Sequence, residues 1–385
     1  SLPALADIGP GSPVGAAFGY GTTFPEKYQR ALYVCDWTFG TMYAIHLEPS
    51  GSTYKAVKEE FVSRTPLPLT DVVIGRDGAM YFAVGGRGGQ SELYRVRYVG
   101  GEPTDPVDAR DERHAADRRL RRELETLHRR ADDPAAAVAQ ALPALASPDR
   151  FLRYAARVAL EHQPLELWQS QALLAAGPRA RIEGAIAVAR QALPAAQAGV
   201  LAALDAIDPS DLSEQDLLAL VRAYQLALIR LGPPSAEAAA AIATRFGPLF
   251  PAGAFDLDRE LSALLVAVRA PGIAAKLVEL LAAPSGSAGG TNLAPDENDL
   301  RKLIERNQGY GSAVRASLEK RSDLLQIHYA YVLRTLRDEP GSRMWSPADR
   351  KGYYEWFPRA REWAGGNSFR KFLANIEAES LAGLS

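Results

Sequence analysis

The sequence predicts an α+β chain of several domains, in which a partial β-propeller of about two blades precedes an α-helical, HEAT-like solenoid. Residues 14–98 hold short segments rich in Val, Tyr, Ile and Phe, separated by Gly and Pro turns, as strands and hairpins require. From Asp105 the chain changes to long runs of Ala, Leu, Arg and Glu that break at Pro or Gly. Helix pairs that recur about every 35 to 45 residues are typical of HEAT-like repeats.

Turn residues join the predicted strands in chain order. Phe39-Gly40 separates the first two, Arg76-Asp77-Gly78 separates the next two, and GGRGGQS (85–91) leads into the last. The five predicted strands are 31–37, 41–47, 69–75, 79–85 and 92–98. At three or four strands to a blade this is an antiparallel meander of about two blades, whereas propellers close with about four to eight. We therefore expect either the end of a larger propeller or a segment that packs against another structure.

From residue 105 onward, the sequence predicts a series of helices followed by an aromatic-rich C-terminal segment. The predicted helices are 112–130, 148–162, 181–193, 213–231, 257–269 and 272–282. Ser147, Ser213 and Asp256 are candidate N-caps, and Ser346-Pro347 is a helix start. The predicted domains are propeller blades over 1–104, a HEAT-like solenoid over 105–283, a Gly/Ser-rich loop over 284–298 and an aromatic-rich helical cap over 299–385.

The charge, the cysteine count and the absence of certain motifs exclude several classes of function for this sequence. With 44 Lys and Arg against 46 Asp and Glu, the formal charge is −2, which argues against a dedicated nucleic-acid binder. Cys35 is the single cysteine, so intrachain disulfides, Cys-based zinc sites and a CxxCH haem attachment are excluded within this sequence. The scattered histidines and the glycine-rich loops match no metal or phosphate motif, and no transmembrane segment is expected. Since there is no initiator Met, we expect a piece of a longer or processed product.

Late aromatic residues are candidates for a partner site. Trp345, Trp356 and Trp363 stand among several tyrosines and phenylalanines, and Trp and Tyr are over-represented in binding hot spots. The alternative is that they form the core of a terminal helical cap.

Several motifs carry a resemblance to a known family. ALYVCDW, the Gly40 turn, PLPLTDVV, DGAMYF and LYRVRY occur in that order, and DRFLRYAARVALE (149–161), WSPADRKGYYEWFPRA and GGNSFRKFL follow. Together they resemble the closing blades, first helical repeat and ending of the planctomycete-type membrane-bound dehydrogenase family, relatives of quinoprotein glucose and sorbosone dehydrogenases. The resemblance covers most of the chain and is strongest over 10–100 and 343–375.

The resemblance implies export to the periplasm, a redox context and a neighbouring c-type cytochrome module. Such dehydrogenases hold the carboxylates of pyrroloquinoline quinone with basic side chains, as electrostatics requires. The corresponding loop positions here are Thr38, Pro68 and Thr70, none of them basic. We therefore expect no cofactor in this chain, although the quinone is possible in the parent family.

These observations lead to a principal hypothesis and two alternatives. The principal one is a scaffold, the protein-interaction portion of an exported dehydrogenase-like protein, which docks a propeller to a redox or other partner. The first alternative is a fragment of a quinone-dependent sugar or alcohol dehydrogenase, with Asp36, Asp71 and Arg87 lining the channel of the propeller. The second is a glycan-binding module that uses the late tryptophans.

Overall fold

The computed structural model describes residues 2–86, 88–284, 297–319, 322–363 and 367–382. It is an α+β chain, as the sequence predicts, with two small antiparallel sheets and many helices. The chain divides into two compact units. The β-unit comprises residues 1–122 and 293–318, and the helical unit comprises residues 123–292 and 319–385.

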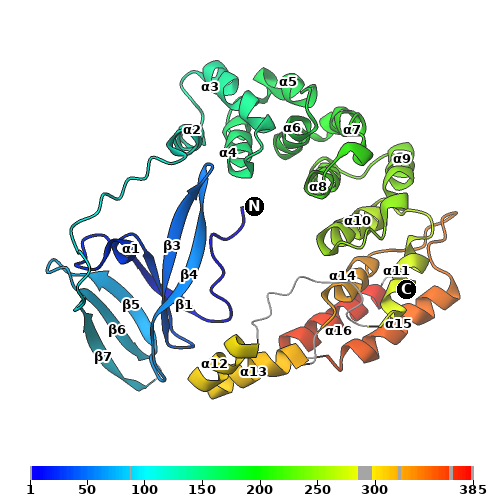
Figure 1. Cartoon of the computed structure of the whole chain (residues 1–385). Coiled ribbons are helices and arrows are strands. Elements are labelled where there is room, and N and C mark those ends of the chain that lie inside the picture. The colour runs from blue at the N-terminus through cyan, green and yellow to red at the C-terminus, as the bar shows by residue number, and fades with distance from the viewer. Residues whose placement is uncertain (1, 87, 285–296, 320–321, 364–366, 383–385) are drawn as a thin grey trace. The chain divides into compact units, whose positions relative to one another are not determined.

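The β-unit contains two antiparallel sheets (Figure 1). Sheet A is ordered β1-β2-β3-β4, and its strands are β1 (Pro13–Phe18), β2 (Leu32–Asp36), β3 (Thr41–Ser50) and β4 (Thr53–Ser63). Sheet B is ordered β5-β6-β7, and its strands are β5 (Leu69–Ile74), β6 (Met80–Gly86) and β7 (Gly89–Val96). A short helix, α1 (Glu26–Gln29), joins β1 to β2. Five of the seven strands were predicted, whereas β1 and β4 were not.

The two sheets share one apolar core. Along β2 and β3, alternate residues share one face of sheet A, because successive side chains of a strand point to opposite faces. Side chains from both sheets and their connections form the buried cluster: Phe24, Ala31, Tyr33, Cys35, Met42, Ala44, Leu67, Leu69, Val72, Met80, Phe82 and Val84. The first strands of the two sheets, β1 and β5, also pack against each other. The tight turn between β2 and β3 requires Gly40, whose φ is +61° and whose Cβ position would lie 2.6 Å from the Arg64 carbonyl oxygen.

Two helices from late in the chain belong to the β-unit. They are α12 (Glu297–Arg306) and α13 (Gln308–Glu319), whereas the sequence predicts one aromatic-rich cap over 299–385. Arg306 forms an ion pair with Glu60 of β4, and Asn307 Nδ2 donates a hydrogen bond to the Thr38 carbonyl 3.0 Å away. These polar contacts join segments more than 240 residues apart, a separation that local sequence patterns do not reveal.

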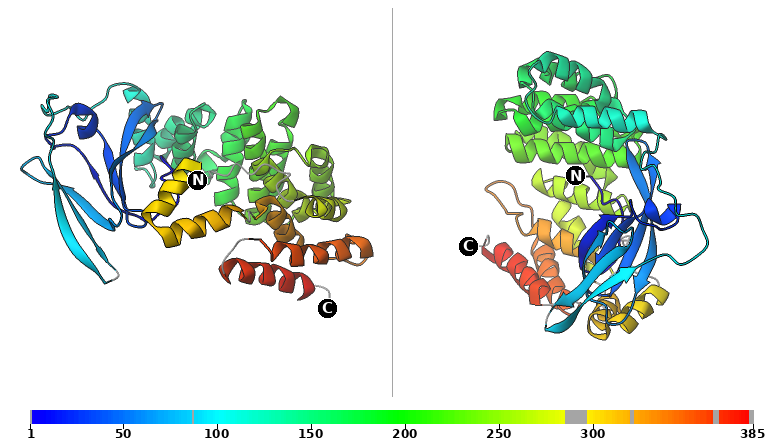
Figure 2. Two further views of the ribbon diagram at one scale, coloured as in Figure 1. Left: turned by 60° about the horizontal axis from the view of Figure 1, so that its bottom comes forward. Right: turned by 90° about the vertical axis from the view of Figure 1, so that its left-hand side faces the viewer.

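The helical unit contains two rows of helices (Figures 1 and 2). Successive members of one row, here called the inner row, pack side by side: α4 (Arg150–Glu161), α6 (Pro178–Gln191), α8 (Glu214–Leu231), α10 (Phe255–Ala267) and α14 (Leu324–Leu333). The other, here called the outer row, consists of α3 (Pro134–Ala141), α5 (Gln169–Leu173), α7 (Gln197–Asp205), α9 (Ala236–Phe246) and α11 (Ile273–Ala282). The helix α2 (Ala115–Thr126) precedes the rows, and α15 (Pro347–Ala360) and α16 (Asn367–Ala382) follow them.

Helix starts show which local predictions hold. Ser213 caps α8, because its Oγ accepts the Asp216 amide, and Ser346 caps α15 through a reciprocal capping box with Asp349. The prediction of Ser147 was wrong, since Asp149 caps α4 instead and accepts the amides of the first helical turn. Asp256 was also wrong as a cap, because it lies inside α10, which begins at Phe255.

Candidate functional site

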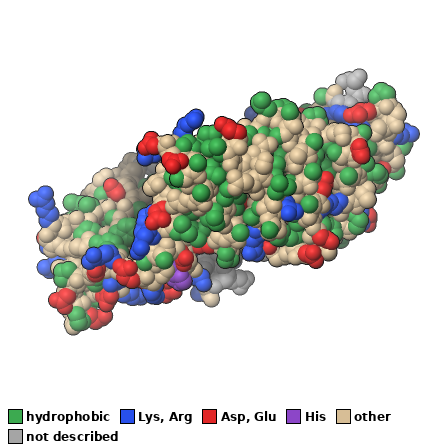
Figure 3. Space-filling view, turned by 90° about the horizontal axis from the view of Figure 1, so that it is seen from above, with side chains coloured by type: hydrophobic (Ala, Val, Ile, Leu, Met, Phe, Trp, Pro, Cys, Tyr) green, Lys and Arg blue, Asp and Glu red, His purple; other side chains and the backbone are tan. Residues whose placement is uncertain are grey.

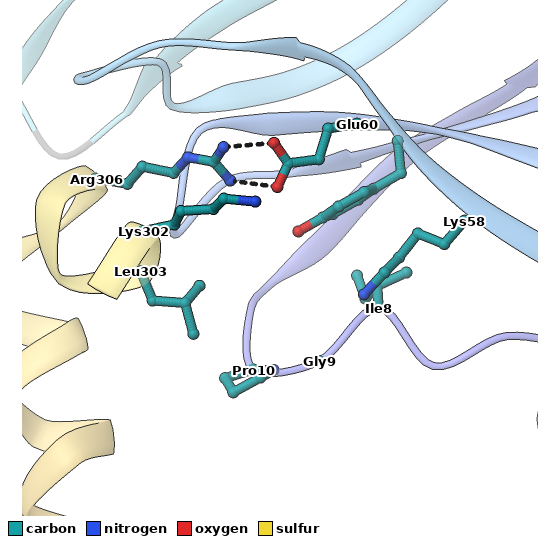
Figure 4. A pocket seen from close by; sticks show the side chains of 9 residues that line it. Ile8, Gly9, Pro10, Lys58, Glu60, Lys302, Leu303 and Arg306 are labelled. Atoms are coloured by element: carbon teal, nitrogen blue, oxygen red, sulfur yellow. Dashed lines mark hydrogen bonds and ion pairs between the residues drawn. The ribbon is translucent and has the colours of Figure 1, made fainter. Parts of the chain in front are cut away.

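The β-unit contains a pocket between α12, β4 and the segment before β1 (Figure 4). Its volume is about 300 Å³, and we name it the α12 pocket. Its lining residues are Ile8, Gly9, Pro10, Tyr43, Lys58, Glu60, Lys302, Leu303 and Arg306. Three segments far apart in the sequence therefore build this site.

An ion pair closes one end of the α12 pocket. The Arg306 guanidinium donates from Nη1 and Nη2 to the two carboxylate oxygens of Glu60, at 3.0 and 2.6 Å. Arg306 Nη1 also donates to Thr41 Oγ1 at 3.0 Å, and the arginine side chain is only 13% exposed. Such a bidentate pair has a fixed geometry. Through it, α12 is held at a defined position along β4.

The remaining polar side chains of the pocket, those of Lys58, Lys302 and Tyr43, can all donate hydrogen bonds. Figure 4 shows Lys302 of α12 and Lys58 of β4 reaching into the space from opposite sides. Lys58 Nζ lies 5.2 Å from the centroid of the Tyr43 ring, within the range of a cation–π contact. Burial raises the pKa of Tyr43 to about 12, so its phenol keeps its proton at neutral pH.

The lining of the pocket holds more cationic than anionic side chains. Its lining carries the cationic side chains Lys58, Lys302 and Arg306 against the single carboxylate of Glu60. The hydrogen-bonded Arg306 guanidinium, followed by the charges of Lys302 and Lys58, holds the pKa of Glu60 below its usual range despite partial burial. The sequence contained one signal for this site, the i, i+4 spacing of Lys302 and Arg306, but nothing in it indicated that β4 was their partner.

Asp36 and Asp71, two of the predicted cofactor-binding residues, lie in the β-unit. Asp36 is buried at the end of β2, and its carboxylate oxygens accept backbone amides from Ser12 (2.7 Å), Thr38 (3.1 Å) and Phe39 (3.1 Å). The structure thus shows Asp36 stabilising the β2–β3 turn. Asp71 lies exposed on β5. The third predicted residue, Arg87, lies outside the described residues, and a cofactor role for the three stays a prediction.

The late tryptophans lie at the end of the helical unit. Trp345 and Trp356 are buried, at 6% and 0% exposure. Trp345 Nε1 donates to the Leu336 carbonyl at 3.0 Å, and Trp356 Nε1 donates to Gln326 Oε1 at 2.9 Å. Trp363 is half-buried, with its ring edge-on to Trp356 at a centroid distance of 5.8 Å. The structure gives these residues packing contacts, and partner binding through them stays a prediction.

The helical unit has a second pocket of about 360 Å³ beside α10 and α14. Two buried carboxyl groups line it, those of Asp258 and Asp323. Asp258 accepts the backbone amides of Ala252 and Gly253 at 2.6 and 3.0 Å, while burial raises its pKa. Asp323 accepts the amides of Leu325 and Gln326 as the N-cap of α14. Both carboxyl groups therefore have a structural role in turning the chain into a helix.

Charged side chains connect neighbouring helices of the inner row. Arg157 Nη1 of α4 lies 3.3 Å from Glu183 Oε2 of α6, and Arg190 Nε of α6 lies 2.8 Å from Glu161 Oε2 of α4. The Glu161 side chain is only 5% exposed, so its charge is partly desolvated and depends on these partners. The two crossed pairs fix how α4 and α6 align.

Neither a metal cluster nor a membrane span emerges from the described part of the chain. Over these residues, no group of three or more His, Cys, Asp or Glu side chains is placed to hold a metal ion. No helix in the same ranges combines the length and the apolar character that crossing a membrane requires.

Comparison with known proteins finds no counterpart for the chain: no family model matches it, and no curated protein or solved structure matches it significantly.

Proposed function

We propose that this chain is the scaffold, or protein-interaction, portion of an exported dehydrogenase-like protein, and that it docks a propeller to a redox or other protein partner. The observation that carries the proposal is the composition of the exposed surface of the inner row. There, α8 carries both an exposed isoleucine and a half-exposed arginine, while α14 adds exposed apolar side chains and α6 adds a half-exposed arginine.

The exposed apolar residues of the inner row are large. Ile229 of α8 is 68% exposed, and Leu324 and Tyr331 of α14 are 51% and 38% exposed. The side chains of Arg190 on α6 and Arg222 on α8 are about half exposed, at 50% and 51%. Tyr and Arg are enriched where proteins bind one another, and apolar contacts supply the buried centre of such interfaces. A row of repeated helices offers an extended surface of this kind.

The outer row differs in composition. Figure 3 views the molecule from the side on which the outer row lies in Figure 1, and hydrophobic side chains and backbone cover much of that face. Leu174 at the end of α5 and Leu193 before α7 are each 79% exposed, but alanines surround them. The outer row therefore provides a control surface with exposed leucines and few arginines.

The β-unit supports the propeller part of the proposal. Each sheet is an antiparallel meander, and the first strands of the two sheets lie together, as the inner strands of neighbouring propeller blades do. In this interpretation the two sheets, of four and three strands, are two blades of a larger propeller that precedes the HEAT-like helices. The resemblance described above supplies the exported, periplasmic setting and the redox partner.

A binding measurement tests the proposal. The full chain is immobilised, and a purified c-type cytochrome module and a purified dehydrogenase-type propeller are passed over it separately. We expect at least one of them to bind, and Ile229→Glu to weaken that binding about tenfold or more, because a buried charge without a partner is costly at an interface. Leu174→Glu, the matched control on the outer row, should leave the affinity unchanged. Absence of binding to both proteins, or equal effects of the two variants, would contradict the proposal.

A further inference from the structure

We infer that the pocket of the helical unit lined by Asp258, Leu280, Leu325 and Tyr329, here called the α10–α14 pocket, binds a small organic ammonium ion. The ligand is a primary amine on an apolar body, and its ammonium group donates hydrogen bonds to the Asp258 carboxylate and to the Tyr329 hydroxyl oxygen. This inference is independent of the proposed function, because the ligand is a small molecule and no protein partner takes part.

Three helices of the helical unit build the α10–α14 pocket. Asp258 belongs to α10, Leu280 to α11, and Leu325 and Tyr329 to α14. The three helices pack against one another and lie together in Figure 1. The volume of about 360 Å³ falls at the lower end of the range for small-molecule sites, which is about 300–1,000 Å³. The pocket therefore suits a ligand of small size.

The Asp258 carboxyl group lines the pocket without a full positive charge beside it. Its side chain is 2% exposed, and its oxygens accept the amides of Ala252 and Gly253 at 2.6 and 3.0 Å. These amides are neutral, and within the part of the chain that the structure describes Asp258 makes no ion pair. The N-terminus of α10 carries only about half an elementary charge, which offsets part of the carboxylate charge. Because a buried ionised carboxyl is costly without a counter-charge, burial raises the pKa of Asp258, and a cationic ligand would supply that charge.

The Tyr329 hydroxyl is a second polar group of the pocket. Tyr329 is 3% exposed, and its ring is held edge-on to Phe250 at a centroid distance of 6.0 Å. Among the described residues, its hydroxyl has no hydrogen-bond partner. Burial and then the negative charges of Asp258 and Asp323 raise the pKa of the phenol, so the hydroxyl lies within electrostatic reach of both carboxyl groups of the lining. Buried tyrosine hydroxyls usually have a partner, and we expect the ligand to provide it here.

The Asp323 carboxyl also lines the pocket, but it already has other contacts. It accepts two amides as the N-cap of α14, and it takes part in further interactions. The ligand's ionic contact is therefore assigned to Asp258 alone.

The donors and the charge that the pocket lacks are those of a primary ammonium group. Such a group carries one positive charge and three N–H donors, whereas the Asp258 carboxylate and the Tyr329 oxygen can both accept. A quaternary ammonium ion has the charge but no N–H, and an alcohol has a donor but no charge. Pro251, Leu280 and Leu325 supply an apolar wall for the carbon body of the ligand. The described part of the lining contains no Lys, Arg or His.

Isothermal titration calorimetry on the full chain at neutral pH tests this inference. The probes are n-butylammonium and 2-phenylethylammonium, which are both protonated under these conditions. The matched alcohols, 1-butanol and 2-phenylethanol, are neutral controls of similar shape, and trimethyl(2-phenylethyl)ammonium is the control without N–H donors. We expect saturable binding with one-to-one stoichiometry for at least one primary ammonium ion. Its alcohol and the quaternary ion should bind about tenfold more weakly, the scale of a hydrogen bond to a charged group.

A tyrosine variant connects the binding to the pocket without disturbing the fold. Tyr329→Phe removes only a hydroxyl without a protein partner, so we expect an unchanged melting temperature and ammonium binding weakened about threefold or more. Tyr331→Phe is the matched control, because Tyr331 lies exposed on the same helix and does not line the pocket. It should leave the affinity unchanged.

A second pair of variants tests the carboxylate. Asp258→Asn should weaken binding about tenfold or more, whereas Asp256→Asn, at an exposed position of α10 outside the pocket, should not. Since Asp258 also accepts two backbone amides, thermal unfolding shows whether Asp258→Asn is folded. If it is not, Tyr329→Phe decides.

Three outcomes would overturn the inference. The first is the absence of saturable binding by both primary ammonium ions. The second is equal affinity for a primary ammonium ion and for its alcohol or quaternary counterpart, since that would indicate an apolar cavity or a diffuse attraction of cations. The third is a Tyr329→Phe variant that binds the ammonium ion as tightly as Tyr331→Phe does.

Discussion

The most informative perturbation of the helical unit is Trp356→Phe. Trp356 is fully buried on α15, and its indole Nε1 donates to Gln326 Oε1 of α14 at 2.9 Å. Gln326 is itself buried, and its Nε2 donates to the Ala283 carbonyl at 3.0 Å. Phenylalanine would keep an aromatic ring at the position but would remove this donor and part of the volume.

Two contributions lower the free energy of unfolding of the Trp356→Phe variant. Leaving the Gln326 oxygen buried without its donor costs about 1–3 kcal/mol. The smaller ring leaves a cavity that costs about 1 kcal/mol more. The total of about 2–4 kcal/mol corresponds to a fall in melting temperature of roughly 5–15 °C for a unit of this size.

Differential scanning calorimetry and urea unfolding followed by circular dichroism measure this loss. The control is Trp363→Phe, because Trp363 is half-buried and contacts Trp356 edge-on. We expect the control to cost less than about 1 kcal/mol, as most substitutions of partly exposed residues do. Equal shifts in the two variants, or no shift for Trp356→Phe, would refute the packing role assigned here to Trp356.

Two further predictions concern the β-unit. Asp36→Ala should destabilise the chain by about 3 kcal/mol or more, because it removes the acceptor of three backbone amides. The control Asp71→Ala, at an exposed position of β5, should cost under about 1 kcal/mol. Urea unfolding measures both losses, and equal losses would contradict the role of Asp36 in stabilising the β2–β3 turn. The pKa of Glu59 is lowered from 4.5 to about 2, chiefly by its hydrogen bond with Lys27. The ionised Glu59 side chain therefore stabilises the folded chain above about pH 4.5, and this contribution is lost as the pH falls towards 2. Glu59→Gln should therefore flatten the stability profile of the chain over that window, and an unchanged profile would contradict the linkage.

The strands that could be predicted share one local pattern. Those with continuous Val, Tyr, Ile and Phe and a flanking glycine turn, such as β2 and β6, were found within one or two residues. The prediction missed β4, TYKAVKEEFVS, because four of its eleven residues are charged. Its outward residues make ion pairs, as Glu59 does with Lys27, and charged residues are common on strands at the edge of a sheet. Pairing with β3 decided the conformation of this segment.

The helices also differ in how well local sequence patterns predict them. Long helices with apolar spacing, such as α4 and α8, were predicted nearly to their ends. The outer-row helices α3, α5, α7 and α9 were not predicted individually, since alanine-rich stretches interrupted by Pro and Gly carry little periodicity. Their packing against the inner row supplies the stability that a short isolated helix lacks.

The sequence by itself determined the α+β class, the change from strands to helices near residue 105, and the turns that need glycine, because these features depend on local backbone preferences. Only the tertiary structure decided that Asp36 caps a turn, that Trp356 is buried, and that α12 lies beside β4. The physical reason is that ion pairs and pockets form between atoms that are close in space. The α12 pocket combines side chains from residues 8–10, 43–60 and 302–306, and no local pattern records which distant segments will meet.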